Sequence, residues 1–244
     1  MNELLVLLER FSPGYRDRIE GYPDWLLDEL EEAFGRPLPG PYRDFARNMG
    51  VNGGPILAHV RSYDPLLDVA ELYRLSPPSE LPPRRFLFVF GDPDPLAPTP
   101  YWLDLESPSE DGDYQVVRMS FGEESWKQQH RDFVSFREML FLWAMEYIHM
   151  PNFPHHARYL REKGQQTVTT EDLAHILAKL GFTQLPYPRH SLLFERDDAA
   201  VRLYRRPNDS SFEIRVGMRN LDELKHFQAV IEDNADLEKP VWDP

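Results

Sequence analysis

Apolar residues recur at helical spacing over the first 50 positions of the chain. Between residues 24 and 34 they fall at i, i+4, i+7 and i+8 with carboxylates on the opposite side, and Gly35 follows. Between residues 38 and 49 they fall at i, i+4, i+7, i+8 and i+11, before Gly50. These spacings predict two amphipathic helices, preceded by a helix over residues 2–11.

The middle of the chain changes to short apolar runs that are typical of β-strands. Residues 85–91, 100–107 and 114–121 read RFLFVFG, PYWLDLES and YQVVRMSF, and an Asp-Gly pair lies between the last two. Because Asp-Gly suits a tight hairpin turn, we predict an antiparallel sheet. Weaker patterns predict a strand over 55–61, a helix that begins at Asp64 and Pro65, and a long core helix from Asp132 to His149.

A polar segment, residues 161–170, separates this pattern from a second one. Thr169 and Asp172 have the spacing of a capping box at the start of a helix. Three strand-like runs follow, and then a final helix that Asn220 can cap. We therefore predict an α+β protein of two domains, residues 1–165 with an antiparallel sheet flanked by helices and residues 166–244 with the order αβββα.

Composition narrows the function classes. The chain has 244 residues, 41% of them hydrophobic, and no cysteine, which excludes disulfides, thiolate metal sites and a cysteine nucleophile. Its net charge of −14 argues against nucleic acid and anionic membranes as partners, and residues 1–150 carry −12 of it, from 26 acidic and 14 basic side chains. The first residues lack the pattern of a signal peptide or membrane anchor, so we expect a cytoplasmic protein that can attract a basic partner.

The most enzyme-like motif is Asp92-Pro93-Asp94, at the end of an apolar run. Carboxylates two residues apart after a strand could hold a divalent metal and a nucleotide diphosphate, as in metal-dependent glycosyltransferases. Asp-Pro steps are also ordinary turn formers, and we favour that interpretation. A glycosyltransferase-like enzyme that uses Asp92 and Asp94 is the remote alternative.

The other candidate catalytic groups are weaker. Asp104 and Glu106 share one face of a strand, which suits an acid–base pair, but exposed strand carboxylates are far commoner. His149, His155 and His156 lack HExxH spacing and a nearby acidic partner, which favours loop or helix-end positions over metal ligation. Neither GxSxG nor a phosphate loop ending in GK[ST] occurs. We therefore predict no catalytic residue, no cofactor and no metal site.

Arginines gather on one face of the last predicted sheet. Alternation along residues 211–219 turns Arg215 outward, beside Arg202 and Arg206 of the preceding strand. The αβββα order also occurs in double-stranded RNA binding domains, but those carry a lysine cluster where this chain reads NLDE. We expect these arginines to be solvated or to dock on the acidic first domain, without nucleic acid.

The glycines of MGVNGG, residues 49–54, follow a helix. A phosphate cradle needs glycines before a helix N-terminus, where the backbone N–H groups and the helix dipole point outward. We expect these glycines instead to supply positive φ angles at a helix end and in a sharp turn into the sheet.

The stretch LLDELEEAFGRPLPGPYRDFARNMGVNGG resembles the signature of the SUKH superfamily, also called the Smi1/Knr4-like family. An acidic helix is followed by G-x-x-LP-x-x-Y-x-x-F and a terminal NG, and RFLFVFGD and YWLDLES are similar to the family's strand pair. The proline-rich DPDPLAPTP and the tail beyond residue 165 depart from the pattern. The signature residues are Gly35, Leu38, Pro39, Tyr42, Phe45, Asn52 and Gly53.

This resemblance implies an α+β immunity protein that binds the toxin domain of a polymorphic or contact-dependent bacterial system, without catalysis. Some fungal relatives regulate cell-wall synthesis, so a regulatory scaffold that binds a host protein is the alternative. Because many nuclease toxins are basic, the predicted mechanism is an acidic surface that covers the toxin's active site. The expected contacts are carboxylates of a proline-rich loop and a hairpin tip: Asp92, Asp94, Glu110, Asp111 and Asp113.

Overall fold

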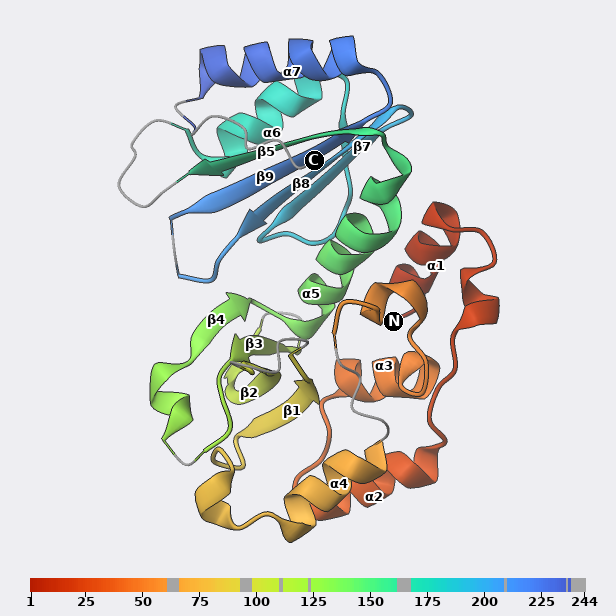
Figure 1. Ribbon diagram of the computed structural model, residues 1–244, viewed down its shortest axis with the longest axis vertical. Helices are drawn as coiled ribbons and strands as arrows, with labels where there is room; N and C mark the ends of the chain where they lie inside the picture. Colours follow the sequence, from red (N-terminus) through yellow and green to blue (C-terminus); the bar gives the residue numbers. More distant parts are fainter. Residues whose placement is uncertain are drawn as a thin grey trace. The chain divides into compact units, whose positions relative to one another are not determined.

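The computed structural model describes residues 1–60, 66–92, 98–109, 112–122, 124–161, 168–208, 210–235 and 237, with the backbone alone at 66–68 and 78. The chain divides into two compact units, Met1–Leu140 and Phe141–Pro244 (Figure 1). Each unit contains helices and an antiparallel sheet, so the predicted α+β class is confirmed. Within the described ranges, no helix is long and apolar enough to cross a membrane.

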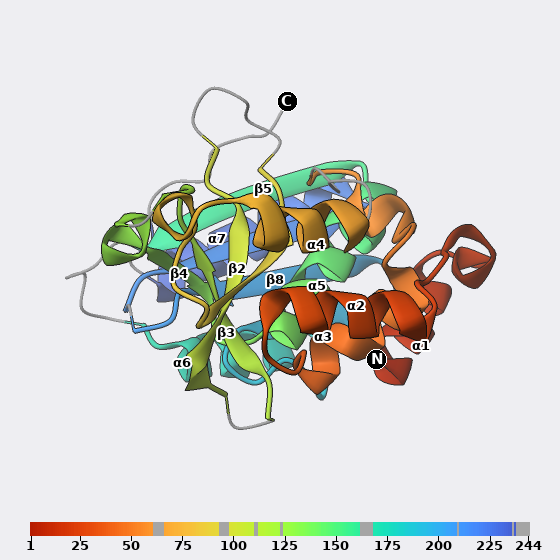
Figure 2. The same cartoon turned by 90° about the horizontal axis from the view of Figure 1, so that it is seen from below.

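The helices predicted for the first 50 residues are confirmed as α1, Asn2–Phe11, α2, Asp24–Phe34, and α3, Gly40–Met49, and α4, Leu66–Leu75, follows them. Gly35 ends α2 with a φ of 80°, and its N–H donates to the carbonyl oxygen of Glu31 at 2.8 Å. Tyr42 and Phe45 are buried on α3, and their rings lie edge-on to Phe136 with centroid separations of 5.8 and 5.2 Å. α2 packs against α4 (Figure 2), so the helices enclose an aromatic core.

The turn after α3 is fixed by side chains as well as by glycine. The side-chain oxygen of Asn52 accepts from the N–H of Gly54 at 2.9 Å. The buried Tyr15 hydroxyl donates to the carbonyl of Gly53 at 2.7 Å and accepts from the N–H of Ile56 at 3.1 Å. The positive φ lies at Gly54, at 68°, whereas the glycine that ends α3 has a φ of −71°. The prediction of a positive φ at that helix end is therefore wrong, although the tight turn itself is present.

The sheet of the first unit consists of β1, Phe86–Phe90, β2, Tyr101–Pro108, β3, Tyr114–Arg118, and β4, His130–Phe133, in that order. Each strand is antiparallel to the next, which confirms the predicted arrangement of the first three. Trp102 lies wholly within the core, and its indole N–H donates to the carbonyl of Met119 at 3.1 Å. The sheet therefore forms from local pairings between strands that are consecutive in the chain.

Two predicted elements of the first unit are wrong. The expected strand over 55–61 is absent from its described residues, which form the end of a 3₁₀ helix, Gly54–Leu57, and a turn. The long helix begins at Phe136 and not at Asp132, because the segment before it is β4, in which Phe133 pairs with β3. That helix, α5, Phe136–Trp143, then continues as a π-helical segment, Ala144–His149. The predicted helix start at Asp64 and Pro65 lies outside the described residues.

The second unit contains β5, His155–Arg161, α6, Thr170–Lys179, β6, Thr183–Gln184, β7, Leu192–Arg196, β8, Ala199–Arg205, β9, Phe212–Met218, and α7, Leu221–Asn234. Its strands pair antiparallel in the order β5-β9-β8-β7-β6, and α6 and α7 cover one face of the sheet (Figure 1). The capping box of α6 is confirmed, since Thr169 and Asp172 exchange side-chain-to-backbone hydrogen bonds of 3.1 and 3.0 Å. The side chain of Asn220 likewise accepts from the first N–H groups of α7.

The division between the units lies before the predicted position at residues 165 and 166. It falls within α5, between Leu140 and Phe141. The reason is β5, which pairs with β9 along its whole length and so makes residues 155–161 part of the second sheet. Ala157 and Tyr159 are buried at alternate positions of β5, a short period-two pattern that the αβββα prediction missed together with the brief β6.

His59 provides a pH-dependent test of the first unit's packing. Burial lowers the pKa of His59 to about 4 from an ordinary value of 6.5, although a backbone hydrogen bond with Ile56 opposes the shift. We expect the imidazole to stay neutral as the pH falls from 7 to about 5. The buried neutral imidazole therefore contributes fully to the stability of the folded state above pH 6.5. This contribution is lost as the pH falls from 6.5 towards 4, because the unfolded chain binds the proton first. An NMR titration of the ring protons, assigned with a His59→Gln variant, measures this, and a midpoint near 6.5 would contradict it.

Candidate functional site

Asp92 lies in the interior of the first unit. Its side chain accepts from the N–H of Thr99 at 3.1 Å and from the Thr99 hydroxyl at 2.8 Å, and it forms an ion pair with Arg118. The accessible position predicted for Asp92 is therefore wrong, because the carboxylate is buried against Thr99 and against Arg118 of β3. A metal or nucleotide at this motif would have to displace Arg118. Asp94, the second carboxylate of the motif, lies outside the described residues.

Asp113 is also structural. It is completely buried between β2 and β3, and its two carboxylate oxygens accept from the N–H groups of Tyr114 and Arg137, each at 2.7 Å. Arg137 is in the first turn of α5, where backbone N–H groups have no partner within the helix. Asp113 therefore caps α5, and its predicted exposure at a hairpin tip is wrong. Glu110 and Asp111 lie outside the described residues.

The remaining candidate catalytic groups are engaged in other interactions. The guanidinium of Arg85 lies 2.9 Å from Glu106 and 3.4 Å from the buried Asp104, so the two carboxylates share a counter-ion. His155 and His156 begin β5, so the loop position predicted for them is wrong, while His149 ends the π-helical segment as expected. Within the described ranges, no group of three or more His, Asp or Glu residues is arranged to hold a metal ion.

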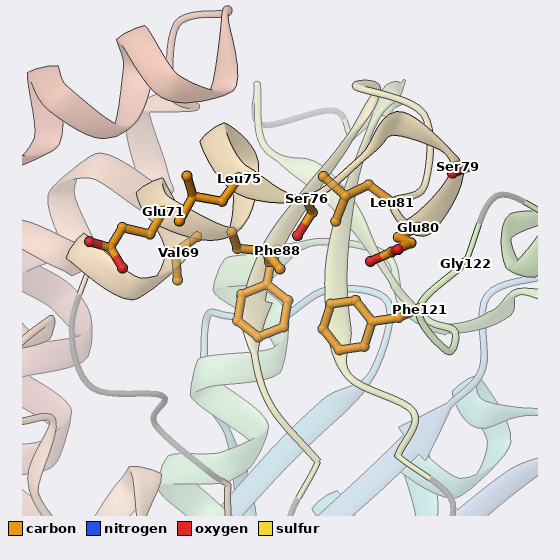
Figure 3. A pocket seen from close by; sticks show the side chains of 11 residues that line it. Val69, Glu71, Leu75, Ser76, Ser79, Glu80, Leu81, Phe88, Phe121 and Gly122 are labelled. Atoms are coloured by element: carbon orange, nitrogen blue, oxygen red, sulfur yellow. The ribbon is translucent and has the colours of Figure 1, made fainter.

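An apolar groove of about 730 Å³ opens on the first unit (Figure 3). It is formed by α4, by the 3₁₀ helix Pro78–Glu80, by β1 and by the segment after β3. Figure 3 shows the Phe88 and Phe121 rings side by side, with Leu75 and Leu81 above them. The residues that define the groove are Val69, Glu71, Leu72, Leu75, Ser76, Ser79, Glu80, Leu81, Phe88, Phe121 and Gly122.

Phe121 is the fixed aromatic surface of the groove. Its ring stacks on Phe88 with centroids 5.9 Å apart and meets Trp102 edge-on at 5.4 Å. Despite these contacts Phe121 is 38% exposed, and Leu75 on α4 is 76% exposed. A concentration of exposed apolar groups beside a hollow is typical of a binding surface. Phe88 and Trp102 therefore hold the Phe121 ring in place at the surface of the groove.

The rim of the groove carries uncompensated negative charge. Glu71 and Glu80 are exposed, and neither has an ion-pair partner among the described residues. Figure 3 shows Glu71 to the left of the two rings and Glu80 above Phe121. Their unit holds 25 acidic and 14 basic side chains, a net charge of −11. The groove therefore combines an apolar floor with a field that attracts cations.

Sequence reasoning missed this groove because its members are scattered. The predicted strand over residues 114–121 includes Phe121, but β3 ends at Arg118, so Phe121 lies outside the sheet. Leu75 is the last residue of α4 and lies off the buried face that contains Val69 and Tyr73. The one local signal is an apolar residue off the buried face of its helix, four residues after Glu71, and a single such residue is common on protein surfaces.

Three arginines form a row across the sheet of the second unit. Arg158 on β5 and Arg202 on β8 each stand directly opposite Arg215 on β9, on the face away from α6 and α7. Arg202 and Arg215 were predicted to be solvated or to dock on the first domain, and both expectations are wrong, because their ion-pair partners Glu146 and Glu213 belong to the second unit. Glu213 accepts from Nε of Arg158 at 2.7 Å and from Nε of Arg215 at 3.0 Å, and it pairs with Arg202. Glu146, from the π-helical segment, pairs with Arg215 and lies 2.8 Å from Nε of Arg202.

This arginine row, Arg158, Arg215 and Arg202, keeps its carboxylate partner ionised. Burial disfavours the charged form of Glu213, but the positive charges of Arg202, Arg215 and Arg158 outweigh it and hold the pKa of Glu213 below its ordinary value. Arg206, which follows β8, is exposed beside the row.

Comparisons with protein-family models, with curated proteins and with solved structures found no match.

The chemistry of the groove suits binding. Its described lining offers two glutamates and two serines without a histidine, lysine or arginine to serve as their acid, base or electrostatic partner. Its floor offers aromatic and branched apolar surface, which stabilises complexes when it is desolvated. The geometry therefore favours recognition of an apolar group that is flanked by positive charge.

Proposed function

We propose that this protein is a non-catalytic protein-binding protein whose first unit receives an apolar side chain of a basic partner in the groove. The observation that carries the proposal is the exposure of Leu75 and Phe121 between Glu71 and Glu80. A side chain that fills such a groove displaces water from both partners, which makes it an anchor of the interface. The glutamates then favour Lys or Arg beside the anchor and raise the association rate.

The partner that we propose is a bacterial toxin domain. The resemblance of residues 26–54 to the SUKH signature supports an immunity role, and a net charge of −11 on the first unit is compatible with a basic partner. A nuclease toxin fits best, because its active site must be basic to hold phosphates. Neutralisation would follow from occlusion: the acidic surface around the groove covers that active site.

Coexpression with the toxin domain encoded by the neighbouring gene tests this function. We expect a stoichiometric complex on gel filtration at low salt, loss of toxin activity in the complex, and weaker association at high salt. An active toxin that forms no complex at either salt concentration would overturn the immunity role.

Variants of the groove test its place in the interface. We expect Leu75→Ser and Phe121→Ser each to weaken the complex by about tenfold or more, because truncated hot spots cost about 2 kcal/mol. The double charge reversal Glu71→Lys with Glu80→Lys should mainly slow association, and the effect should shrink at high salt. Val6→Ser and Glu32→Lys, at exposed positions of α1 and α2, are the matched controls. Groove variants that weaken binding no more than these controls would place the interface elsewhere.

A further inference from the structure

The arginine row is a costly arrangement for a sheet. Like charges that stand directly opposite each other on neighbouring strands destabilise the pairing, and here Arg215 has an arginine on both sides. Glu146 and Glu213 offset two of the three charges. One positive charge is left over on a face of a chain whose net charge is −14.

Further cations surround a hollow of about 490 Å³ at the end of this row. Arg158, Arg161 and Arg206 line it, and Glu213 is the one carboxylate among its described lining residues. Glu213 is already shared by the three arginines of the row. Arg206 is exposed and has no ion-pair partner within the described part of the chain. Among the described lining residues, arginines therefore outnumber carboxylates, and Arg206 is the cation available for a ligand.

The hollow also offers a surface for a flat ring. Leu160 and Tyr204 stand on either side of Glu213 in the next row across the strands. Tyr204 lines the hollow, and the guanidinium of Arg202 covers one face of its ring, with 5.5 Å between the guanidinium carbon and the ring centroid. Ser211 adds a hydroxyl at the edge of the hollow. Arginines, an aromatic side chain and a hydroxyl together match a phosphate joined to a planar ring.

We propose that this hollow binds a small phosphorylated ligand that carries a planar ring, of the mononucleotide class. Arg206 and Arg161 bind the phosphate oxygens, Arg158 adds charge from the row, and the ring lies against Tyr204. The volume of the hollow is within the range of small-ligand sites. The site belongs wholly to the second unit and does not depend on the partner of the groove.

Calorimetric titration of the full chain with AMP, ATP, adenosine and inorganic phosphate tests the proposal. We expect AMP and ATP to bind, inorganic phosphate to bind at least about tenfold more weakly, and adenosine to give no measurable heat. Arg206→Glu and Arg161→Glu should each weaken AMP at least about tenfold, and Tyr204→Leu should weaken AMP without changing inorganic phosphate. Circular dichroism verifies that each variant is folded.

The matched control is Arg189→Glu, which reverses an exposed charge in the same unit outside the hollow. An equal loss in Arg189→Glu and Arg206→Glu would overturn the site, because the effect would then come from net charge. If inorganic phosphate bound as tightly as AMP, the planar ring of the ligand would contribute nothing to binding, and that part of the proposal would be wrong. Absence of heat with all four compounds would overturn the proposal and leave the proposed function of the groove untouched.

Discussion

Replacement of Glu213 by Gln is expected to lower the stability of the second unit by about 3 kcal/mol near neutral pH. The amide has the shape of the carboxylate but no charge, and Glu213 is the shared acceptor of Arg158, Arg202 and Arg215. Without it, Arg202 and Arg215 keep Glu146 as a partner, while Arg158 loses the carboxylate that it pairs with. Breaking a partly buried ion pair on one side costs more than the pair contributes.

The stabilisation by Glu213 depends on pH, because only its ionised form pairs with the arginines. Because the pKa of Glu213 is held below its ordinary value of 4.5, the carboxylate stabilises the folded state fully above pH 4.5. That stabilisation is lost as the pH falls through the lower pKa of the folded state, where Glu213 itself becomes protonated. The difference between Glu213→Gln and the unchanged protein should therefore be largest near neutral pH and should shrink under acid conditions.

Amide hydrogen exchange of β8 and β9 measures the effect within the second unit. Glu232→Gln, at an exposed position of α7, is the matched control and should leave exchange in these strands nearly unchanged. A penalty of equal size at neutral and acid pH would show that Glu213 acts through packing and not through its charge.

The elements that could be predicted from the sequence are those with strong local periodicity. α2 and α3 each bury one apolar face, and β1, β2 and β3 are joined by short connections, so their partners lie nearby in the chain. β5 shows why the rest was missed. β5 pairs with β9, which lies about 55 residues later in the chain, the separation between Arg158 and Glu213. The seven residues of β5 have mixed polarity, and nothing in them identifies a partner so far away.

The candidate sites also depend on contacts between residues that are far apart in the chain. Acidic residues in loops are usually accessible, which is why Asp92 and Asp113 were expected at a surface. Arg118 and a backbone N–H of α5 reverse that expectation, and both partners come from 24 or more residues away in the chain. Conversely, nothing in the sequence distinguishes Leu75 and Phe121 from other apolar residues. They form a groove only because the fold brings α4 and the segment after β3 together. The SUKH resemblance concerns the helices and not these surfaces, and it stays a prediction.

Asp113→Ala is expected to destabilise the first unit by about 3 kcal/mol without weakening partner binding by the folded protein. The substitution leaves the N–H groups of Tyr114 and Arg137 without their acceptor in a buried place, and it removes a negative charge from the N-terminal end of α5. Asp113→Asn should cost less, because one amide oxygen can still accept a hydrogen bond.

Urea unfolding followed by the fluorescence of the first unit, in which Trp102 is buried, measures the loss, and the exposed Asp17→Ala is the control. Affinity for the partner is measured under conditions in which the variant is fully folded. Unchanged stability with lost affinity would restore Asp113 as a contact residue and would require the loop between β2 and β3 to open when the partner binds. Lost stability with unchanged affinity would assign this carboxylate to the fold and leave recognition to the groove, where the exposed apolar side chains lie together with Glu71 and Glu80.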